Sequence, residues 1–175
     1  MPSAIYPGTF DPVHSGHIDI ATRAARLFEH LTVAIYARPL KSLLFNTEER
    51  RAMIEDALAH IPNLSVETYN GLTVDFARQV HAQAIVRGLR VISDFELEFQ
   101  MALTTKKLAP ELEFVCLMTS QEYAFISAST VKEIAMLGGC VDGMVPASVA
   151  LALQSKLGDP GNSDTNSVRL VSLRD

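Results

Sequence analysis

Cysteine, surplus positive charge and long apolar runs are all scarce in this chain, and each scarcity excludes a class of protein. Cys116 and Cys140 are the only cysteines among 175 residues, and they form neither a metal-ligand spacing nor a disulfide framework. A reducing compartment is therefore favoured. The formal net charge of −5 argues against a general nucleic-acid binder, which normally has a basic surface. No apolar run has the length that spans a bilayer.

The rest of the composition is that of a compact, soluble, globular protein. Hydrophobic residues make up 48% of the chain and charged residues 20%, and 175 residues suit one domain with a sizeable core. The first residues lack a charged stretch followed by an apolar one, so we expect no signal peptide. We expect a cytoplasmic protein that binds neither nucleic acid nor membrane. A small anionic substrate is compatible with the acidic balance, because local basic residues can build a positive pocket.

Short apolar runs alternate with helical patterns along most of the chain. The expected strands are residues 4–6, 31–36, 64–69, 84–86 and 114–118, and the expected helices are 17–28, 47–59, 73–83, 92–109, 130–137 and 147–157. The alternation predicts an α/β fold, a Rossmann-like, doubly wound, five-stranded parallel sheet with helices on both faces. Thr47 is expected to cap the second helix. Residues 1–157 then form one domain, and the polar, turn-rich residues 158–175 are expected to be a mobile tail.

The most informative segment is the run GTFDPVHSGH at residues 8–17. It follows an expected strand and enters an expected helix, so it lies at a carboxyl strand end, where open α/β sheets bind ligands. A helix start also offers unpaired backbone N–H groups and the positive end of a dipole, which favour phosphate. His14 and His17 can lie on one side of the first turn and donate hydrogen bonds to phosphate oxygens.

Other polar segments are expected near the same edge of the sheet. Arg87 and Arg90 follow the fourth expected strand, where guanidinium groups can clamp phosphates. Lys41 follows the second expected strand. The hydroxyl-rich residues 126–130 precede a helix, so their side chains and backbone N–H groups can hold a phosphate.

Each of these segments also has a plain structural interpretation. The two arginines can belong to a solvated turn, Lys41 to a solvated loop, and the hydroxyls of 126–130 to an ordinary helix cap. His14 and His17 could be two metal ligands, although no third ligand is placed near them in the sequence. His14 could equally be a capping or core residue. On the helix expected at 92–109, a solvated face can be formed by the acidic residues Asp94, Glu96 and Glu98. Core or subunit contact is the interpretation of the apolar residues Phe95, Phe99, Met101 and Leu103.

Together the segments resemble one family over about residues 4–157. HSGH at 14–17 resembles the T/HxGH signature of the nucleotidyltransferases. Further segments resemble bacterial phosphopantetheine adenylyltransferases: IYPGTFDP at 5–12, GHIDI at 16–20, RGLR at 87–90, DFE at 94–96 and FIS at 125–127. The resemblance implies adenylyl transfer from ATP to 4′-phosphopantetheine with Mg²⁺ as cofactor. The products are dephospho-coenzyme A and pyrophosphate, in the penultimate step of coenzyme A synthesis. The resemblance also implies a homo-oligomer, typically a hexamer, and it assigns no metal ligands.

The resemblance gives individual residues roles. His17 is the implied transition-state stabiliser, and the other implied catalytic residues are Thr9, Lys41 and Arg90. The implied acceptor-binding residues are Thr9, Lys41, Thr73 and Arg87. The implied ATP-binding residues are Thr9, Phe10, His17, Gly88, Leu89, Arg90, Glu98, Tyr123, Ala124, Phe125, Ile126, Ser127, Ala128 and Ser129. Two positions depart from the family: Ala128 replaces a common serine and loses its hydroxyl, and Thr73 replaces a commonly apolar residue.

Two rival functions remain open on the sequence. One is another adenylyl- or cytidylyltransferase that acts on nicotinamide mononucleotide or a phospho-alcohol. The other is a non-catalytic nucleotide sensor with the same fold. The arginine cluster at 87–90 favours the pantetheine enzyme over the first, and intact Thr9, His17, Lys41 and Arg90 argue against the second.

Overall fold

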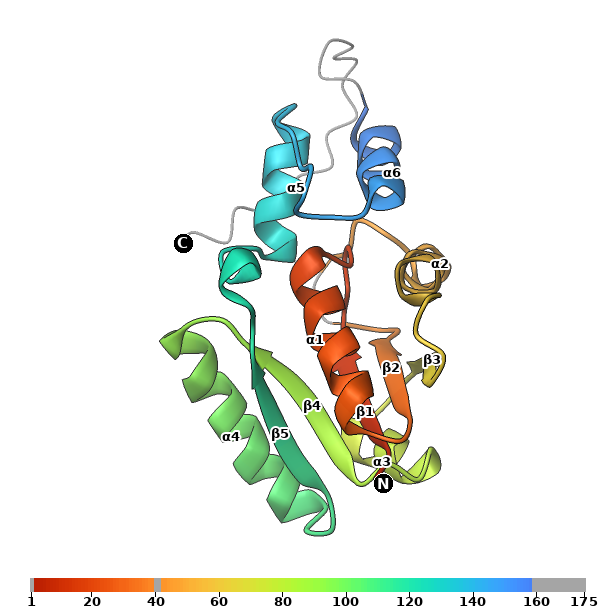
Figure 1. The fold of residues 1–175 in the computed structure, drawn as a ribbon, viewed down its shortest axis with the longest axis vertical. Helices are drawn as coiled ribbons and strands as arrows, with labels where there is room; N and C mark the ends of the chain where they lie inside the picture. The colour runs from red at the N-terminus through yellow and green to blue at the C-terminus, as the bar shows by residue number, and fades with distance from the viewer. Residues whose placement is uncertain (1, 40–41, 159–175) are drawn as a thin grey trace.

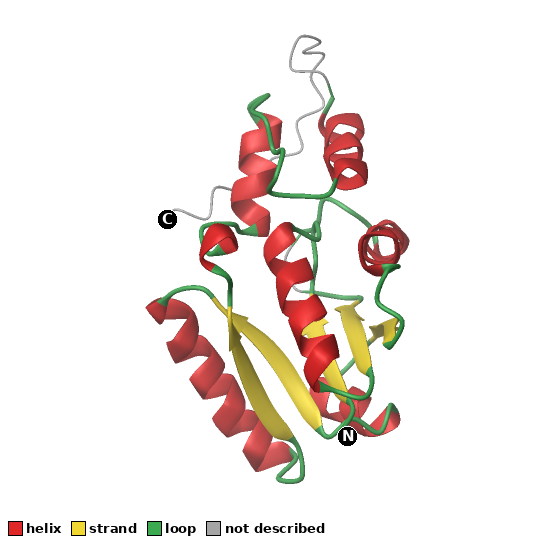
Figure 2. Cartoon of the chain, in the orientation of Figure 1, coloured by secondary structure: helices red, strands yellow, loops and turns green. Residues whose placement is uncertain are grey.

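A five-stranded parallel sheet is the centre of the protein, and the computed structural model describes residues 2–39 and 42–158. The strands are β1 (Ala4–Gly8), β2 (Leu31–Tyr36), β3 (Leu64–Tyr69), β4 (Ala84–Leu89) and β5 (Glu113–Met118), in the order β3-β2-β1-β4-β5 (Figure 1). The helical elements are α1 (Ser15–Leu27), α2 (Thr47–Leu58), α3 (Thr73–Gln79), α4 (Ile92–Leu108), the 3₁₀ turn η1 (Gln121–Tyr123), α5 (Ala128–Met136) and α6 (Ala147–Leu157) (Figure 2). Lys41 and the expected tail beyond Gly158 lie outside the described residues.

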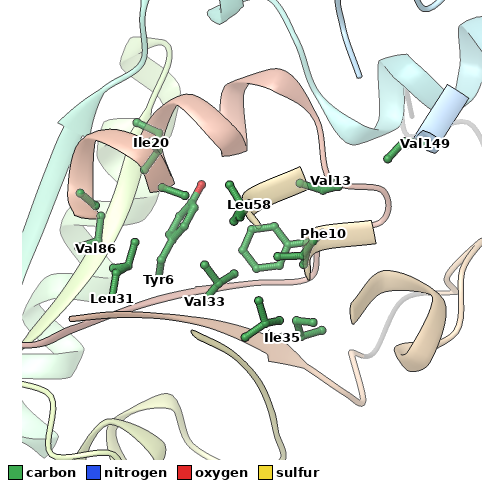
Figure 3. Packing of buried hydrophobic residues seen from close by; sticks show 14 of the residues in the cluster. Tyr6, Phe10, Val13, Ile20, Leu31, Val33, Ile35, Leu58, Val86 and Val149 are labelled. Atoms are coloured by element: carbon green, nitrogen blue, oxygen red, sulfur yellow. The ribbon is translucent and has the colours of Figure 1, made fainter. Parts of the chain in front are cut away.

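Helices cover both faces of the sheet, because alternate residues of each buried strand point to opposite sides. In β1, Tyr6 belongs to the larger apolar cluster, which includes Phe10 and Ile20 (Figure 3). Ile5, one residue earlier, belongs to a second cluster that includes Phe76 of α3. The doubly wound α/β prediction is therefore confirmed. None of the described helices is long and apolar enough to cross a membrane.

The sheet has a switch point between β1 and β4. From β1 the chain builds outward through β2 and β3, and it then returns to place β4 on the other side of β1. β1 pairs with β2 along its whole length, up to Gly8 opposite Ile35, but its pairing with β4 ends at Ile5 opposite Ile85. The carboxyl ends of β1 and β4 therefore have no ladder between them, which leaves room for a ligand at the position where open α/β sheets bind one.

Several expected boundaries are wrong. The strand expected at 84–86 continues to Leu89, because its pairing with β5 extends to Leu89 opposite Met118. The helix expected at 73–83 ends at Gln79, and His81 beyond it takes a left-handed φ of 55°. The 3₁₀ turn η1 was not expected. The other ends either match the expectation or differ from it by one or two residues.

Thr47 is not the cap of α2 but its first residue. Asn46 takes that place, and its side-chain oxygen accepts the N–H of Glu49 at 2.9 Å. The Glu49 carboxylate accepts the N–H of Asn46 in return at 2.8 Å. This reciprocal pair is a capping box, which satisfies two backbone donors at once.

The apolar residues of α4 are not core residues of this chain. Phe95, Phe99, Met101 and Leu103 are 52–58% exposed, so the core interpretation is wrong and subunit contact is the remaining one. Figure 1 shows α4 beside β4 and β5 at one side of the sheet, away from α5 and α6.

Candidate active site

A cavity of about 350 Å³ opens at the carboxyl ends of β1 and β4, at the switch point of the sheet. This volume lies in the range of small-molecule sites. Many residues predicted from the sequence as site residues line it: Thr9, Phe10, His17, Arg87, Gly88, Arg90, Glu98, Ser127, Ala128 and Ser129. They come from the loop after β1, the first turn of α1, the end of β4, α4 and the start of α5.

Other predicted site residues lie outside the lining of this cavity. Leu89 is buried at the end of β4, and Tyr123, Ala124, Phe125 and Ile126 precede α5. The carbonyl of Ile126 nevertheless accepts a hydrogen bond from Arg90 at 3.0 Å, which ties this segment to the cavity wall. Thr73 begins α3, and its hydroxyl lies 2.9 Å from that of Tyr69. Lys41 belongs to the part of the chain that is not described.

The two histidines lie against each other at the start of α1. Their rings are stacked, with centroids 3.6 Å apart, and His14 is the N-cap residue. The backbone N–H of His14 donates to Nδ1 of His17 at 3.3 Å. Because this Nδ1 accepts, the proton of a neutral His17 ring resides on Nε2. His17 therefore presents an N–H donor at the helix N-terminus, where phosphate binds well.

Both rings are held neutral. Burial, the neighbouring His14 and the cationic Arg87 and Arg90 lower the pKa of His17 well below 6.5. Burial and Arg90 lower the pKa of His14 to about 4. Within the described residues, Nδ1 of His14 is buried without a hydrogen-bond partner. At neutral pH both rings are therefore uncharged, so they can donate hydrogen bonds but add no charge to the cavity.

Lower pH should destabilise the protein through His14. An unfolded histidine binds a proton near pH 6.5, but folded His14 stays neutral down to about pH 4. The unfolded state then binds more protons in this window, so stability is lost as the pH falls from about 6.5 towards 4. The loss from His14 alone should reach about 3 kcal/mol at pH 4. Urea unfolding of wild type and His14→Asn at several pH values measures it. An unchanged slope in His14→Asn would contradict the assignment.

Phe10 supports His17 from a strained backbone. Its φ is 51°, a left-handed value that costs a non-glycine residue about 1–3 kcal/mol. The Phe10 ring packs edge-on against His17 at 4.9 Å and against Tyr6 at 5.4 Å. A Cβ on Gly8 would lie 2.8 Å from the Phe10 ring, so only glycine leaves room for this ring. The local strain thus places an aromatic ring behind the imidazole.

The two arginines of the cavity are each held by a carboxylate. Arg87 donates to both oxygens of Glu98, at 2.8 and 2.7 Å, and to the carbonyl of Pro7 at 2.7 Å. Arg90 donates to both oxygens of Asp94, at 3.0 and 3.1 Å. Burial opposes the charge of Arg87, but the hydrogen bonds and charge of Glu98 outweigh it and raise the pKa of Arg87. These carboxylates orient the guanidinium groups. The interpretation of the acidic residues of α4 as a solvated face is therefore wrong for Asp94 and Glu98.

Asp11 and Lys132 complete the cavity, and sequence reasoning did not find them. The buried carboxylate of Asp11 accepts the backbone N–H groups of Leu44 and Phe45 at 3.0 and 2.9 Å. It also accepts Nζ of Lys132 at 2.8 Å. Asp11 therefore joins the loop before α2 to helix α5. The sequence does carry one signal for Lys132, since it lies one turn beyond the hydroxyl-rich start of α5.

No described cluster of three or more His, Cys, Asp or Glu side chains could hold a metal ion. The cavity carboxylates of Asp11, Asp94 and Glu98 are already engaged by cationic side chains. The described residues therefore offer no cavity carboxylate that is free of a cationic partner to act as a metal ligand.

Comparison with known proteins finds similarity over most of the chain. A family model described as cytidylyltransferase-like matches residues 5–134. The phosphopantetheine adenylyltransferase of Thermomicrobium roseum is 56% identical over 156 residues, which cover 87% of this chain and 93% of that relative. Those of Carboxydothermus hydrogenoformans and Synechococcus elongatus are 52% and 54% identical, over 92% and 86% of this chain and 99% and 91% of the relatives.

Proposed function

Since the chain belongs to the phosphopantetheine adenylyltransferase family, we propose that it transfers the adenylyl group of ATP to 4′-phosphopantetheine. The products are dephospho-coenzyme A and pyrophosphate, and the reaction is the penultimate step of coenzyme A synthesis. One observation carries the proposal: the stacked His14 and His17 at a helix N-terminus share a cavity with Arg87 and Arg90. This arrangement suits a ligand with several phosphates.

The chemistry needs positioning and charge stabilisation. An oxygen of the acceptor phosphate attacks the α-phosphorus of ATP, and the bond from that phosphorus to the bridging oxygen breaks. The electron pair of that bond leaves with pyrophosphate. The acceptor phosphate is already ionised near neutral pH, so no general base or covalent nucleophile is required. Catalysis then comes from holding the reactants in line and from donors aimed at the developing charge.

The described residues divide these tasks. His17 donates a hydrogen bond from its Nε2–H to an oxygen on the α-phosphorus, and Arg90 adds a guanidinium beside the nucleotide phosphates. Thr9 orients the acceptor phosphate between His17 and Arg90. Ser127 caps α5, because its Oγ accepts the N–H of Thr130 at 3.0 Å, and Ser129 lies in the first turn of that helix. Backbone N–H groups at this helix start, which faces the cavity, can hold the rest of the triphosphate.

We propose Mg²⁺ as the cofactor; bound together with ATP, it would neutralise part of the negative charge on the triphosphate. Arg90 and Lys132 would neutralise other oxygens of the same group, because both side chains line the cavity.

A transfer assay tests the proposed function against its rivals. Pyrophosphate release is measured with ATP and Mg²⁺ and with one acceptor at a time: 4′-phosphopantetheine, nicotinamide mononucleotide or a phospho-alcohol. The proposal expects release with 4′-phosphopantetheine alone. Release with another acceptor would indicate a different nucleotidyltransferase, and ATP binding without release would indicate a sensor.

Arg87 is expected to serve the acceptor more than ATP, and Lys41 is proposed to share this task. Arg87→Ala should weaken phosphopantetheine binding by about 10–100-fold, because a hydrogen-bonded charge is lost, and should weaken ATP binding less. Calorimetric titration of each ligand measures both affinities. Because Arg87→Ala leaves Glu98 unpaired, the double variant with Glu98→Gln removes that complication. Arg78→Ala, at an exposed arginine paired with Glu111, is the control. Equal losses for the two ligands would show that Arg87 does not belong to the acceptor.

We also propose that the protein is a cytoplasmic homo-oligomer, and family resemblance favours a hexamer. We propose neither a nucleic-acid partner nor a membrane partner. The exposed apolar side chains of α4, together with Met118 at the end of β5, support it, since large exposed apolar patches mark interaction surfaces. Sedimentation of the intact chain measures the assembly, and Phe99→Glu should shift it to smaller species. A monomeric wild type would contradict this part of the proposal.

A further inference from the structure

Arg50, in the first turn of α2, is a buried cation to which the proposed mechanism gives no part. Its exposed fraction is 0%, and its Nη1 donates to the carbonyls of Thr9 and Tyr36 at 2.7 and 3.0 Å. Its Nε donates to the carbonyl of Asn46 at 3.3 Å, and its Nη2 donates to the Thr47 hydroxyl at 3.1 Å. A single guanidinium thus joins the loop after β1, the end of β2 and the start of α2.

The described hydrogen-bond acceptors of Arg50 are all neutral, which distinguishes it from the cations that line the cavity. Among the described residues, each of those cations has a carboxylate partner: Arg87 has Glu98, Arg90 has Asp94 and Lys132 has Asp11. The Asp11 carboxylate also acts on Arg50 through its charge, but it already pairs with Lys132. Arg50 is therefore a further described cation behind the cavity wall, and it forms no ion pair with a described carboxylate.

A buried charge without a partner is costly unless something compensates it. Burial lowers the pKa of Arg50, yet a guanidinium stays protonated at any ordinary pH. The charge lies one hydrogen bond behind Thr9, which lines the cavity. An anion bound in the cavity in front of Thr9, where the phosphates of the substrates are proposed to bind, would therefore compensate this charge.

We propose that Arg50 is a positioning residue for adenylyl transfer: it holds Thr9 through the carbonyl of that residue, and the bound phosphates balance its charge. The inference rests on the proposed function, because that function places phosphates in front of Thr9. Arg50 does not line the cavity and acts on the substrates through Thr9 and through its field. In the low-dielectric interior this field is weakly screened, so it favours anion binding even without contact.

Two substitutions separate the charge from the hydrogen bonds. Arg50→Met removes both, whereas Arg50→Lys keeps the charge but loses the planar fork that reaches four acceptors. Arg51→Met is the matched control, since Arg51 is the next residue of α2 and pairs on the surface with Glu55 at 2.7 Å. For each protein we would measure the rise in Tm caused by inorganic pyrophosphate, and kcat and KM with ATP and 4′-phosphopantetheine.

Arg50→Met should lose most of the Tm rise, because the compensated charge is gone. Arg50→Lys should keep most of the rise and near wild-type KM values, but its kcat should fall about tenfold as Thr9 loses its anchor. Arg51→Met should match wild type. If Arg50 were merely structural, Arg50→Met would lower the starting Tm and leave the pyrophosphate-induced rise unchanged, which would overturn the inference.

Arg50→Lys keeps the inference testable if Arg50→Met does not fold: wild-type kcat in Arg50→Lys would overturn the positioning role. Failure of the proposed function gives a different result, because wild type itself would then show no adenylyl transfer.

Discussion

Replacing His17 with alanine should slow adenylyl transfer by about 10²–10³-fold, the usual effect of removing one preorganised transition-state donor. His17 accepts the backbone N–H of His14 through Nδ1, which leaves Nε2 as its donor. The loss should fall on kcat more than on KM, since the donor matters most when charge develops on the α-phosphoryl oxygens. Steady-state pyrophosphate release with saturating ATP and 4′-phosphopantetheine measures it.

Two controls separate this chemistry from a change of fold. His60→Ala replaces an exposed histidine near the end of α2, and it should transfer adenylyl groups at the wild-type rate. The circular dichroism spectrum of His17→Ala should match that of wild type, because only the first turn of α1 is altered. Turnover near the wild-type level in His17→Ala would remove His17 from the mechanism.

Replacing Asp11 with alanine should destabilise the fold by about 3–5 kcal/mol, because breaking a buried ion pair leaves a buried charge without its partner. The Asp11 side chain is 2% exposed and accepts Lys132 as well as the N–H groups of Leu44 and Phe45. Its removal orphans all three donors. This is a large part of the 5–15 kcal/mol that typically stabilises a domain. Urea unfolding at pH 7 measures the change.

Asp56→Ala is the matched control for Asp11→Ala. Asp56 is exposed on α2 and accepts a hydrogen bond from Ser148 at 2.8 Å, so its loss should cost about 0.5 kcal/mol or less. The double variant Asp11→Ala with Lys132→Met removes both charges, and it should recover part of the lost stability. A loss below about 1 kcal/mol in Asp11→Ala would mean that this ion pair does not hold the loop and α5 together.

Much of the fold follows from local pattern. β2 and β3 lie at the expected residues, and all five expected strands are present. The wrong boundaries lie where a long-range contact determines the end of a strand or helix. β4 extends past Val86 because β5 pairs beside it up to Met118. The apolar residues of α4 face away from the core, and no periodicity along one chain tells a core face from an exposed apolar face.

The residues of the candidate site also fall into those that a local sequence pattern predicts and those that it does not. Arg87 and Arg90 could be predicted because they lie at or just after the end of β4, and His17 because it lies in the first turn of the helix that follows β1. Parallel strands bring their carboxyl ends, and the helix starts that follow them, to one edge. Asp11 and Lys132 could not be paired, since 121 residues separate them. Their contact depends on where α5 lies relative to the loop after β1, which no local sequence pattern encodes.

The sequence by itself determined the alternation of strands and helices, the edge of the sheet that carries the polar residues, and the phosphate-compatible residue types found there. Those properties depend on hydrophobic periodicity and on residue types near strand ends, both of which are local. Only the tertiary structure decided which cation each carboxylate holds, that both histidines are neutral, and that Arg50 is buried behind Thr9. Pairing, burial and pKa depend on atoms contributed by distant segments, so they exist only once the chain has folded.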